Sequence, residues 1–358
     1  MSDIVVWHWA VFGALVAGLL WLDLAVFHRR AHAPSLKESA GWTFFWIALA
    51  IAFNGLVWWW RGTEQGIQFL TAYLVEKSLS MDNIFVFAVI FRFFQVPLKY
   101  QYRVLFWGIL GAIVMRLAFI LLGAELVHRF NWVLPVFGVF LVYTAVKLAS
   151  STETEVDPDA NPLLRFARRH FRISHEEHGN RLFAREGGRW CATPLFLVLI
   201  VIESTDVMFA VDSVPAIFGI TRDPFILLTS NAFAILGLRA LYFVLAGVID
   251  MFRYLHYGLS AVLAFVGLKM IAEYWIGQEG LHLVPPGASL GIILTLLAAS
   301  IAASLAAKHR EQRERIGRVQ EPSPTDACRH KAAFAMTPAE PVGVLLEQND
   351  DVSMGVRT

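Results

Sequence analysis

The stretches EKSLSMDN (residues 76–83) and ESTDVMFAVDS (residues 203–213) place five carboxylates inside two long apolar segments: Glu76, Asp82, Glu203, Asp206 and Asp212. A carboxylate at the centre of a membrane helix costs about 2.5–3.5 kcal/mol on insertion scales. Five unpaired carboxylates would cost about 10–15 kcal/mol, as much as the total stability of an ordinary domain. We therefore expect these acids to serve a function and not only packing.

The composition predicts an all-α polytopic membrane protein. Of 358 residues, 57% are hydrophobic and 16% are charged, whereas soluble proteins have about 25% charged residues. Apolar runs of about 20 residues predict about nine transmembrane helices. Their approximate ranges are 4–27, 40–60, 66–94, 104–124, 130–149, 193–220, 228–250, 255–276 and 285–306. The first run has no basic stretch before it, so we expect a retained helix and not a cleaved signal peptide.

Lysines and arginines predict the orientation in the membrane. Under the nine-helix assignment, 19 of them gather on one face and only Arg61, Arg129 and Arg222 on the other. Because positive loops stay in the cytoplasm, the N-terminus is expected outside and the C-terminus in the cytoplasm of a bacterial inner membrane. Residues 1–306 would form the transmembrane domain, with a cytoplasmic loop at 150–192, and residues 307–358 a mostly disordered cytoplasmic tail.

The cytoplasmic loop changes from acidic to basic along its length. It begins with acids between residues 153 and 159 and continues with arginines from Arg165 onward. Basic segments can bind nucleic acid, but beside a membrane they usually set topology and attract anionic lipid. We therefore expect the lipid bilayer as partner and no nucleic acid.

The third to fifth predicted helices (about 66–149) resemble the sixth to eighth (about 193–276) in the order of their charged residues. Each set opens with an acid-bearing helix, continues with one that carries an arginine near its middle, Arg116 or Arg239, and closes with one that has a late lysine, Lys147 or Lys269. A unit of three helices enters the membrane from opposite sides in its two copies. This predicts two inverted repeats, with a site at the midplane between them.

Helix geometry adds an expectation about Pro215. Glu203 and Asp206 share a helix face, whereas Asp212 lies 240° from Asp206 at 100° per residue. Pro215 cannot donate to the carbonyl of Val211, so the helix is expected to kink or break near Asp212. Such a break would expose backbone carbonyls as cation ligands.

The oxygen-rich acid segments suit a hard divalent cation such as Mg²⁺, Ca²⁺ or Mn²⁺. The predicted metal ligands are Glu76, Asp82, Asn83, Glu203, Asp206 and Asp212, with Met81 and Met208 as soft ligands that would favour Mn²⁺. The competing interpretation is internal neutralisation of the acids, for which Arg116, Arg239 and Lys269 are the available charge partners. It does not explain why the acids cluster on the helices expected to be broken.

The segments EKSLSMDNIFVFAVIF, ESTDVMFAVDSVPAIF and SNAFAILGLRALYF closely resemble the TerC/Alx family of integral membrane proteins, which is named for tellurium resistance and grouped with the LysE-type transporters. The resemblance covers roughly residues 5–306. It implies export of Mn²⁺ from the bacterial cytoplasm, with the five acids as the intramembrane acids of the family. Repulsion by these acids argues against direct transport of tellurite.

The sequence supports three classes of function. The first is a secondary transporter that exports a divalent cation, which exchanges with protons because export against the membrane potential needs a coupled ion. The second is a membrane scaffold or assembly factor, and the third is an exporter of cationic amino acids. No Walker, H-E-x-x-H or G-x-S-x-G motif occurs, so we expect neither an enzyme nor a resident cofactor. The sequence leaves the oligomeric state open.

Overall fold

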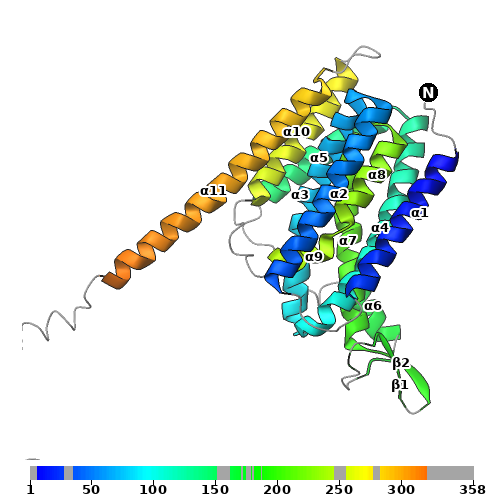
Figure 1. Ribbon diagram of the computed structural model, residues 1–358, viewed down its shortest axis with the longest axis vertical. Helices are drawn as coiled ribbons and strands as arrows, with labels where there is room; N and C mark the ends of the chain where they lie inside the picture. Colours follow the sequence, from blue (N-terminus) through cyan, green and yellow to red (C-terminus); the bar gives the residue numbers. More distant parts are fainter. Residues whose placement is uncertain are drawn as a thin grey trace, which may run out of the picture. The chain divides into compact units, whose positions relative to one another are not determined.

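The structure is a computed structural model that describes residues 6–27, 35–150, 162–170, 172–174, 179, 181–186, 188–245, 255–276 and 283–320. The chain divides into two compact units, Met1–Ala306 and Ala307–Thr358. The first unit is a bundle of long helices whose axes run roughly side by side (Figure 1). Its helices are α1 (Val6–Phe27), α2 (Leu36–Arg61), α3 (Thr63–Phe93), α4 (Leu98–Arg129), α5 (Val133–Ser150), α7 (Pro194–Phe218), α8 (Pro224–Ile235), α9 (Leu238–Leu245), α10 (Leu255–Trp275) and the first part of α11 (Pro286–Gln320).

The prediction of a helical polytopic membrane protein is confirmed. Among the described residues, six helices are long and apolar enough to cross a membrane, or seven if the bent pair α8 and α9 is one span. Helix α1 contributes only a shorter apolar segment, and α3 carries Glu64, Glu76, Lys77, Asp82 and Arg92 along its length. The count of nine spans and the inverted repeats stay predictions.

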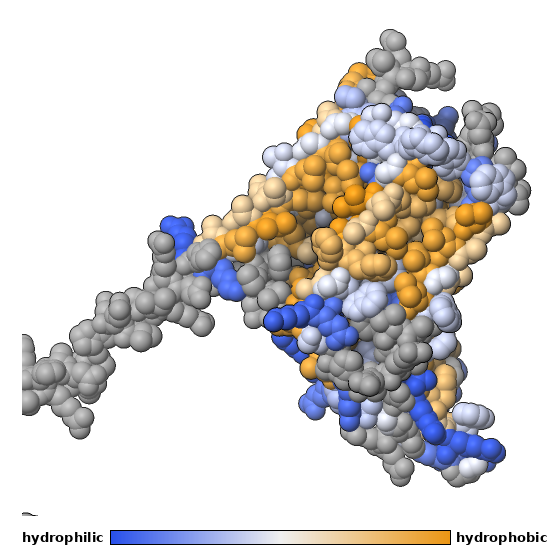
Figure 2. Space-filling view, in the orientation of Figure 1, coloured by the Kyte–Doolittle hydropathy of each residue, from blue (hydrophilic) through white to orange (hydrophobic). Residues whose placement is uncertain are grey.

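The surface of the bundle has the polarity of a membrane protein. Hydrophobic side chains form a broad band across the middle of the helices, and hydrophilic ones gather beyond it (Figure 2). Large apolar side chains are exposed in this bundle, among them Phe44 at 73% and Leu122 at 70%. Trp59 near the end of α2, Trp132 just before α5 and Trp275 at the end of α10 are also exposed. Tryptophan is enriched where a membrane meets water.

Local sequence signals define several helix ends. The Ser35 side chain accepts a hydrogen bond from the backbone N–H of Glu38 and caps α2. Gly62 separates α2 from α3 with φ of 98°, a left-handed conformation that glycine adopts without strain. Asp223 caps α8 by accepting from the backbone N–H groups of Phe225 and Ile226, and Pro224 occupies the first helical position.

Helix α5 packs on α10 more closely than side chains would normally allow. A Cβ placed on Gly138 would lie 2.8 Å from the carbonyl oxygen of Gly267, and one on Gly267 would lie 2.7 Å from the carbonyl oxygen of Gly138. Ser260 also donates a hydrogen bond to the carbonyl of Ala145 across this contact. Small residues at helix contacts are typical of membrane proteins, because van der Waals packing drives association there.

The helices of the two predicted repeats contact one another in corresponding pairs. Helix α3 packs on α8, and α7 packs on α4. Helix α3 also contacts α10, as α7 contacts α5, while α5 and α10 pack on each other. Three hydrophobic clusters result, centred on the C-terminal half of α3 with α4, α7 and α9, on α5 with α7 and α10, and on α2 with α3 and α8.

The expected break at Asp212 is not found. Helix α7 continues through Pro215 to Phe218. A bend of 41° occurs one helix later, where α8 and α9 meet within the second predicted repeat. Gly237 lies at this break with φ of 80°, and the ring of Trp46 packs where its side chain would be.

The segment 150–192 is not a plain loop. It contains a short helix, α6 (Pro162–His170), and a hairpin of strands β1 (Phe183–Glu186) and β2 (Arg189–Ala192) with Phe183 opposite Ala192. Leu164 and Ala167 of α6 are buried in the first hydrophobic cluster. The acidic residues 151–161 lie outside the described residues.

In the predicted tail, α11 continues to Gln320, and residues 321–358 lie outside the description. Lysine, arginine and glutamate, which favour helix, dominate that continuation.

Candidate functional site

Two of the five acids meet on one arginine in the interior of the bundle. Arg116 of α4 forms ion pairs with Glu76 of α3 and with Asp206 of α7, the latter at 3.6 Å between Nη2 and Oδ1. Its Nη1 also donates a hydrogen bond to Ser213 Oγ at 3.1 Å. The three charged residues are at most 2% exposed. A buried charge is tolerable only when it is paired in this way.

Helical spacing explains why these residues meet. Asp206 and Ser213 are seven residues apart on α7, so they share one face of the helix, and both contact Arg116. On α3, Glu76, Ser80 and Asn83 likewise share a face, at spacings of four and three residues. All three are buried. The two acid-bearing helices therefore both present a polar stripe inside the bundle.

The remaining three acids lie apart from Arg116. Glu203 is partly buried, lies against Gly111 of α4 and interacts electrostatically with Asp206. Asp212 accepts a hydrogen bond of 3.2 Å from Thr144 of α5. Asp82 interacts electrostatically with His256 of α10. The expected convergence of all five acids is therefore not found: in the part of the chain that the structure describes, no three His, Cys, Asp or Glu side chains could together hold a metal ion.

Two predicted charge partners bind other groups. Arg239 of α9 pairs with Asp23 of α1, with 2.8 Å between Nη2 and Oδ2, and donates to the carbonyl oxygen of Asp23. Lys269 of α10 pairs with Glu273 at 3.7 Å and donates to the carbonyl oxygen of Gly219 at the end of α7. Sequence reasoning missed Asp23 and Glu273. Both are acidic residues within or beside apolar runs, and this position could have identified them as candidate partners of the buried basic residues.

The two methionines differ in their surroundings. Met208 is 66% exposed on the surface of the bundle, whereas Met81 packs against the first hydrophobic cluster. Neither has a described contact with the carboxylates of the Arg116 cluster. Asn83 is buried, and its Nδ2 has no hydrogen-bond partner in the described residues.

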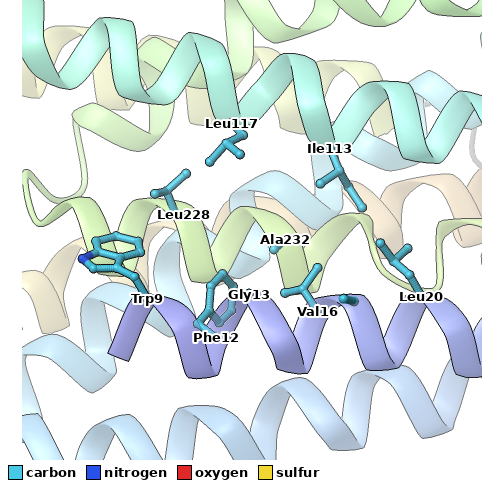
Figure 3. A pocket seen from close by; sticks show the side chains of 10 residues that line it. Trp9, Phe12, Gly13, Val16, Leu20, Ile113, Leu117, Leu228 and Ala232 are labelled. Atoms are coloured by element: carbon cyan, nitrogen blue, oxygen red, sulfur yellow. The ribbon is translucent and has the colours of Figure 1, made fainter. Parts of the chain in front are cut away.

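Two cavities in the bundle are apolar. One, of about 320 Å³, lies between α1, α4 and α8 and is lined by Trp9, Phe12, Gly13, Val16, Ala17, Leu20, Ile113, Leu117, Leu228 and Ala232 (Figure 3). The other, of about 330 Å³, lies between α1 and α2 and is lined mainly by aromatic and aliphatic side chains such as Trp7, Phe53 and Trp59. Such linings fit hydrocarbon and not an ion. The polar cluster around Arg116 is therefore the candidate site.

The apolar bundle defines a multi-pass helical membrane protein, and its interior holds a buried acid–arginine cluster. Residues 61–312 match the family described as the integral membrane protein TerC family. The chain belongs to this family.

The relatives extend over most of the chain. "Uncharacterized membrane protein STKORF319" of Myxococcus xanthus is 50% identical over 297 residues, which cover 83% of this chain and 91% of the relative. "Putative membrane-bound redox modulator Alx" of Escherichia coli strain K12 is 43% identical over 319 residues, 86% of this chain and 97% of the relative. A membrane protein of Rickettsia bellii is 37% identical over 306 residues, 86% and 99% of the two chains. No solved structure matches.

Proposed function

We propose that this protein is a secondary transporter that exports a divalent cation, with Mn²⁺ as the expected ion, from the bacterial cytoplasm. The observation that carries the proposal is the meeting of Glu76 and Asp206 inside the bundle, one from each acid-rich segment, with Arg116 between them. Ionisable residues within membrane segments are rare and usually mark ion or substrate pathways. Carboxylate oxygens are ligands that Mn²⁺, Mg²⁺ and Ca²⁺ prefer.

The packing supports an inverted-repeat architecture for this transporter. If α3, α4 and α5 correspond to α7, α8 and α10, the contact of α3 with α8 corresponds to that of α7 with α4. The spacing of acids agrees with this correspondence, because Glu76 and Asp82 are six residues apart, as are Asp206 and Asp212. Glu76 and Asp206 then occupy equivalent positions at the interface of the repeats, where transporters of this plan bind their substrates.

Thermodynamics favours exchange with protons. Moving one charge across 100 mV is worth about 2.3 kcal/mol, so a divalent ion leaving an inside-negative cell costs about 4.6 kcal/mol, or roughly 3.4 decades of concentration. Uniport would therefore run inward. Entry of protons supplies the driving force for export, and the intramembrane carboxylates Asp82, Glu203 and Asp212 offer further groups to carry them.

The name of the Alx relatives favours a second candidate, modulation of redox state. Such a role needs redox chemistry from the protein or a partner. The chain has only two cysteines, Cys191 and Cys328, and Cys191 is 1% exposed within the hairpin β1–β2. Because the described residues contain no pair of thiols, an indirect effect of metal transport on the redox state is the simpler explanation for a redox role. The scaffold hypothesis stays a further alternative.

Inverted membrane vesicles test the proposal. With the vesicle interior acidic, wild-type protein should accumulate Mn²⁺, and Asp206→Asn and Asp82→Asn should each lower the initial rate per molecule at least tenfold. The amide keeps the shape of the side chain and removes its charge. A variant with both cysteines replaced by alanine is the control and should keep its uptake. Uptake that persists in both acid variants, or that needs the cysteines, would contradict the proposal.

A further inference from the structure

The guanidinium of Arg116 lies between the two carboxylates on which the proposed function rests. It contacts Glu76 from α3 and Asp206 from α7 at once, and these are the two of the five acids that pair with it among the described residues. A guanidinium is always charged in proteins. The site is therefore already occupied by a positive charge that belongs to the protein itself.

The fit of this arginine to the site is incomplete. The 3.6 Å between Nη2 and Asp206 Oδ1 exceeds the 2.7–2.9 Å of a good charge-assisted hydrogen bond. Within the described structure, Asp206 Oδ2, Glu76 Oε2 and Arg116 Nε have no hydrogen-bond partner, although all are buried. Ser80 Oγ, on the same face of α3 as Glu76, is also buried without a partner. Buried oxygens without partners are costly, and a cation would satisfy them.

The other charged groups nearby do not fill this position. On α3, Lys77 donates to the carbonyl oxygen of Ala234 on α8. On α7, Glu203 lies against Gly111 of α4. Asp212 is held by Thr144 of α5, with Lys147 nearby. Arg116 is thus the one basic side chain that bridges Glu76 and Asp206 in the described contacts.

We propose that Arg116 is a tethered counter-ion: it holds the Glu76–Asp206 pair in the ion-free protein and is displaced when a divalent cation binds. This inference rests on the proposed transport function and deepens it. Two cations cannot share the space between the same two carboxylates, so metal and guanidinium compete. Because the guanidinium returns when the metal leaves, the ion-free site never presents two bare carboxylates to the bilayer interior, and the protein can change sides without metal.

Metal binding is the first test. Purified Arg116→Gln should bind Mn²⁺ at least about tenfold more tightly than the wild type, since hydrogen bonds to charged groups of this kind are worth about one to two decades in affinity. The electron paramagnetic resonance signal of free Mn²⁺ measures this directly. Arg116→Lys keeps a tethered charge and should stay near the wild-type affinity. Unchanged or weaker binding by Arg116→Gln would overturn the inference.

Flux measurements supply the second test. In proteoliposomes, Arg116→Gln should retain exchange of external for internal Mn²⁺, because that cycle never passes through the ion-free state. Its net Mn²⁺ transport should fall, so that the ratio of net transport to exchange drops at least tenfold. A ratio equal to that of the wild type would overturn the inference.

Arg239→Gln is the matched control. Arg239 is equally buried but pairs with Asp23 and not with the acids of the site. Its replacement should leave both the affinity for Mn²⁺ and the flux ratio of the folded protein unchanged. A tenfold tightening in this variant too would overturn the inference, because removal of any buried arginine would then suffice.

Ser213→Ala covers the case in which Arg116→Gln does not fold. It removes the hydrogen bond to Arg116 Nη1 and leaves both carboxylates in place. Looser restraint of Arg116 should tighten Mn²⁺ binding severalfold; unchanged or weaker binding would count against displacement. Wild-type protein that binds Mn²⁺ but transports none would contradict the proposed function alone, and the binding comparison would still decide the inference.

Discussion

The ion pair between Asp23 and Arg239 shows how single residues hold the edge of the bundle together. Both side chains are buried, and Arg239 contacts both the carboxylate and the backbone carbonyl oxygen of Asp23. Removing one partner from a buried pair leaves the other charge uncompensated, which typically costs about 3–5 kcal/mol. Replacing both partners removes that penalty.

This pair gives a prediction for stability. Asp23→Asn and Arg239→Met should each lower the thermal stability of the detergent-solubilised protein strongly, by about 3–5 kcal/mol where unfolding is reversible. The double variant should be destabilised by clearly less than the sum of the two. Thermal unfolding of the four proteins, followed by loss of the monodisperse peak in gel filtration, measures the coupling. Additive losses would show that the two charges do not stabilise each other.

The sequence predicted part of the candidate site. The cost of charge in a membrane singled out Glu76, Asp206 and Arg116, and the structure brings these three together. It did not reveal which acid each arginine would bind, because partners far apart in the chain meet only through helix packing. Arg239 was expected near the acid segments, yet its partner lies 216 positions earlier in the chain.

At the scale of helices, the contact between α5 and α10 yields another prediction. Gly138→Ala or Gly267→Ala would press a methyl group against the backbone of the other helix. Overpacking of this kind usually costs about 1–3 kcal/mol. Gly55→Ala is the control, because nothing lies within 4 Å of the added Cβ. The melting temperature should fall for Gly138→Ala and Gly267→Ala and not for Gly55→Ala. Equal melting temperatures in all three variants would show that α5 and α10 can move apart without loss of stability.

Helix ranges followed from apolar runs, but the position of the break did not. Pro215 was expected to kink or break its helix, and α7 does not break there but continues to Phe218. A proline removes one backbone hydrogen bond, and membrane helices often tolerate this because neighbouring groups satisfy the freed carbonyl. The actual break, at Gly237, needs a left-handed residue and a close approach of Trp46. A single glycine in an apolar run does not by itself predict that another side chain packs against it.

For the whole molecule, the distribution of basic residues predicts the topology. A reporter fused after residue 310 should be active in the cytoplasm, and one fused at residue 2 should be active in the periplasm, because 19 lysines and arginines fall on one face and three on the other. Paired phosphatase and fluorescent-protein fusions read the two compartments. A cytoplasmic N-terminus would remove the nine-helix arrangement and the inverted repeats with it.

The Asp23–Arg239 contact also constrains how the protein is made. The ribosome delivers α1 before α9, so the arginine that neutralises the acid of α1 emerges only later. Until then, α1 must hold a costly carboxylate in the bilayer or leave it at the membrane surface. Final docking of α1 therefore has to wait for the second half of the chain. During synthesis, α1 is therefore made well before α9 but can be held by this contact only after α9 has emerged.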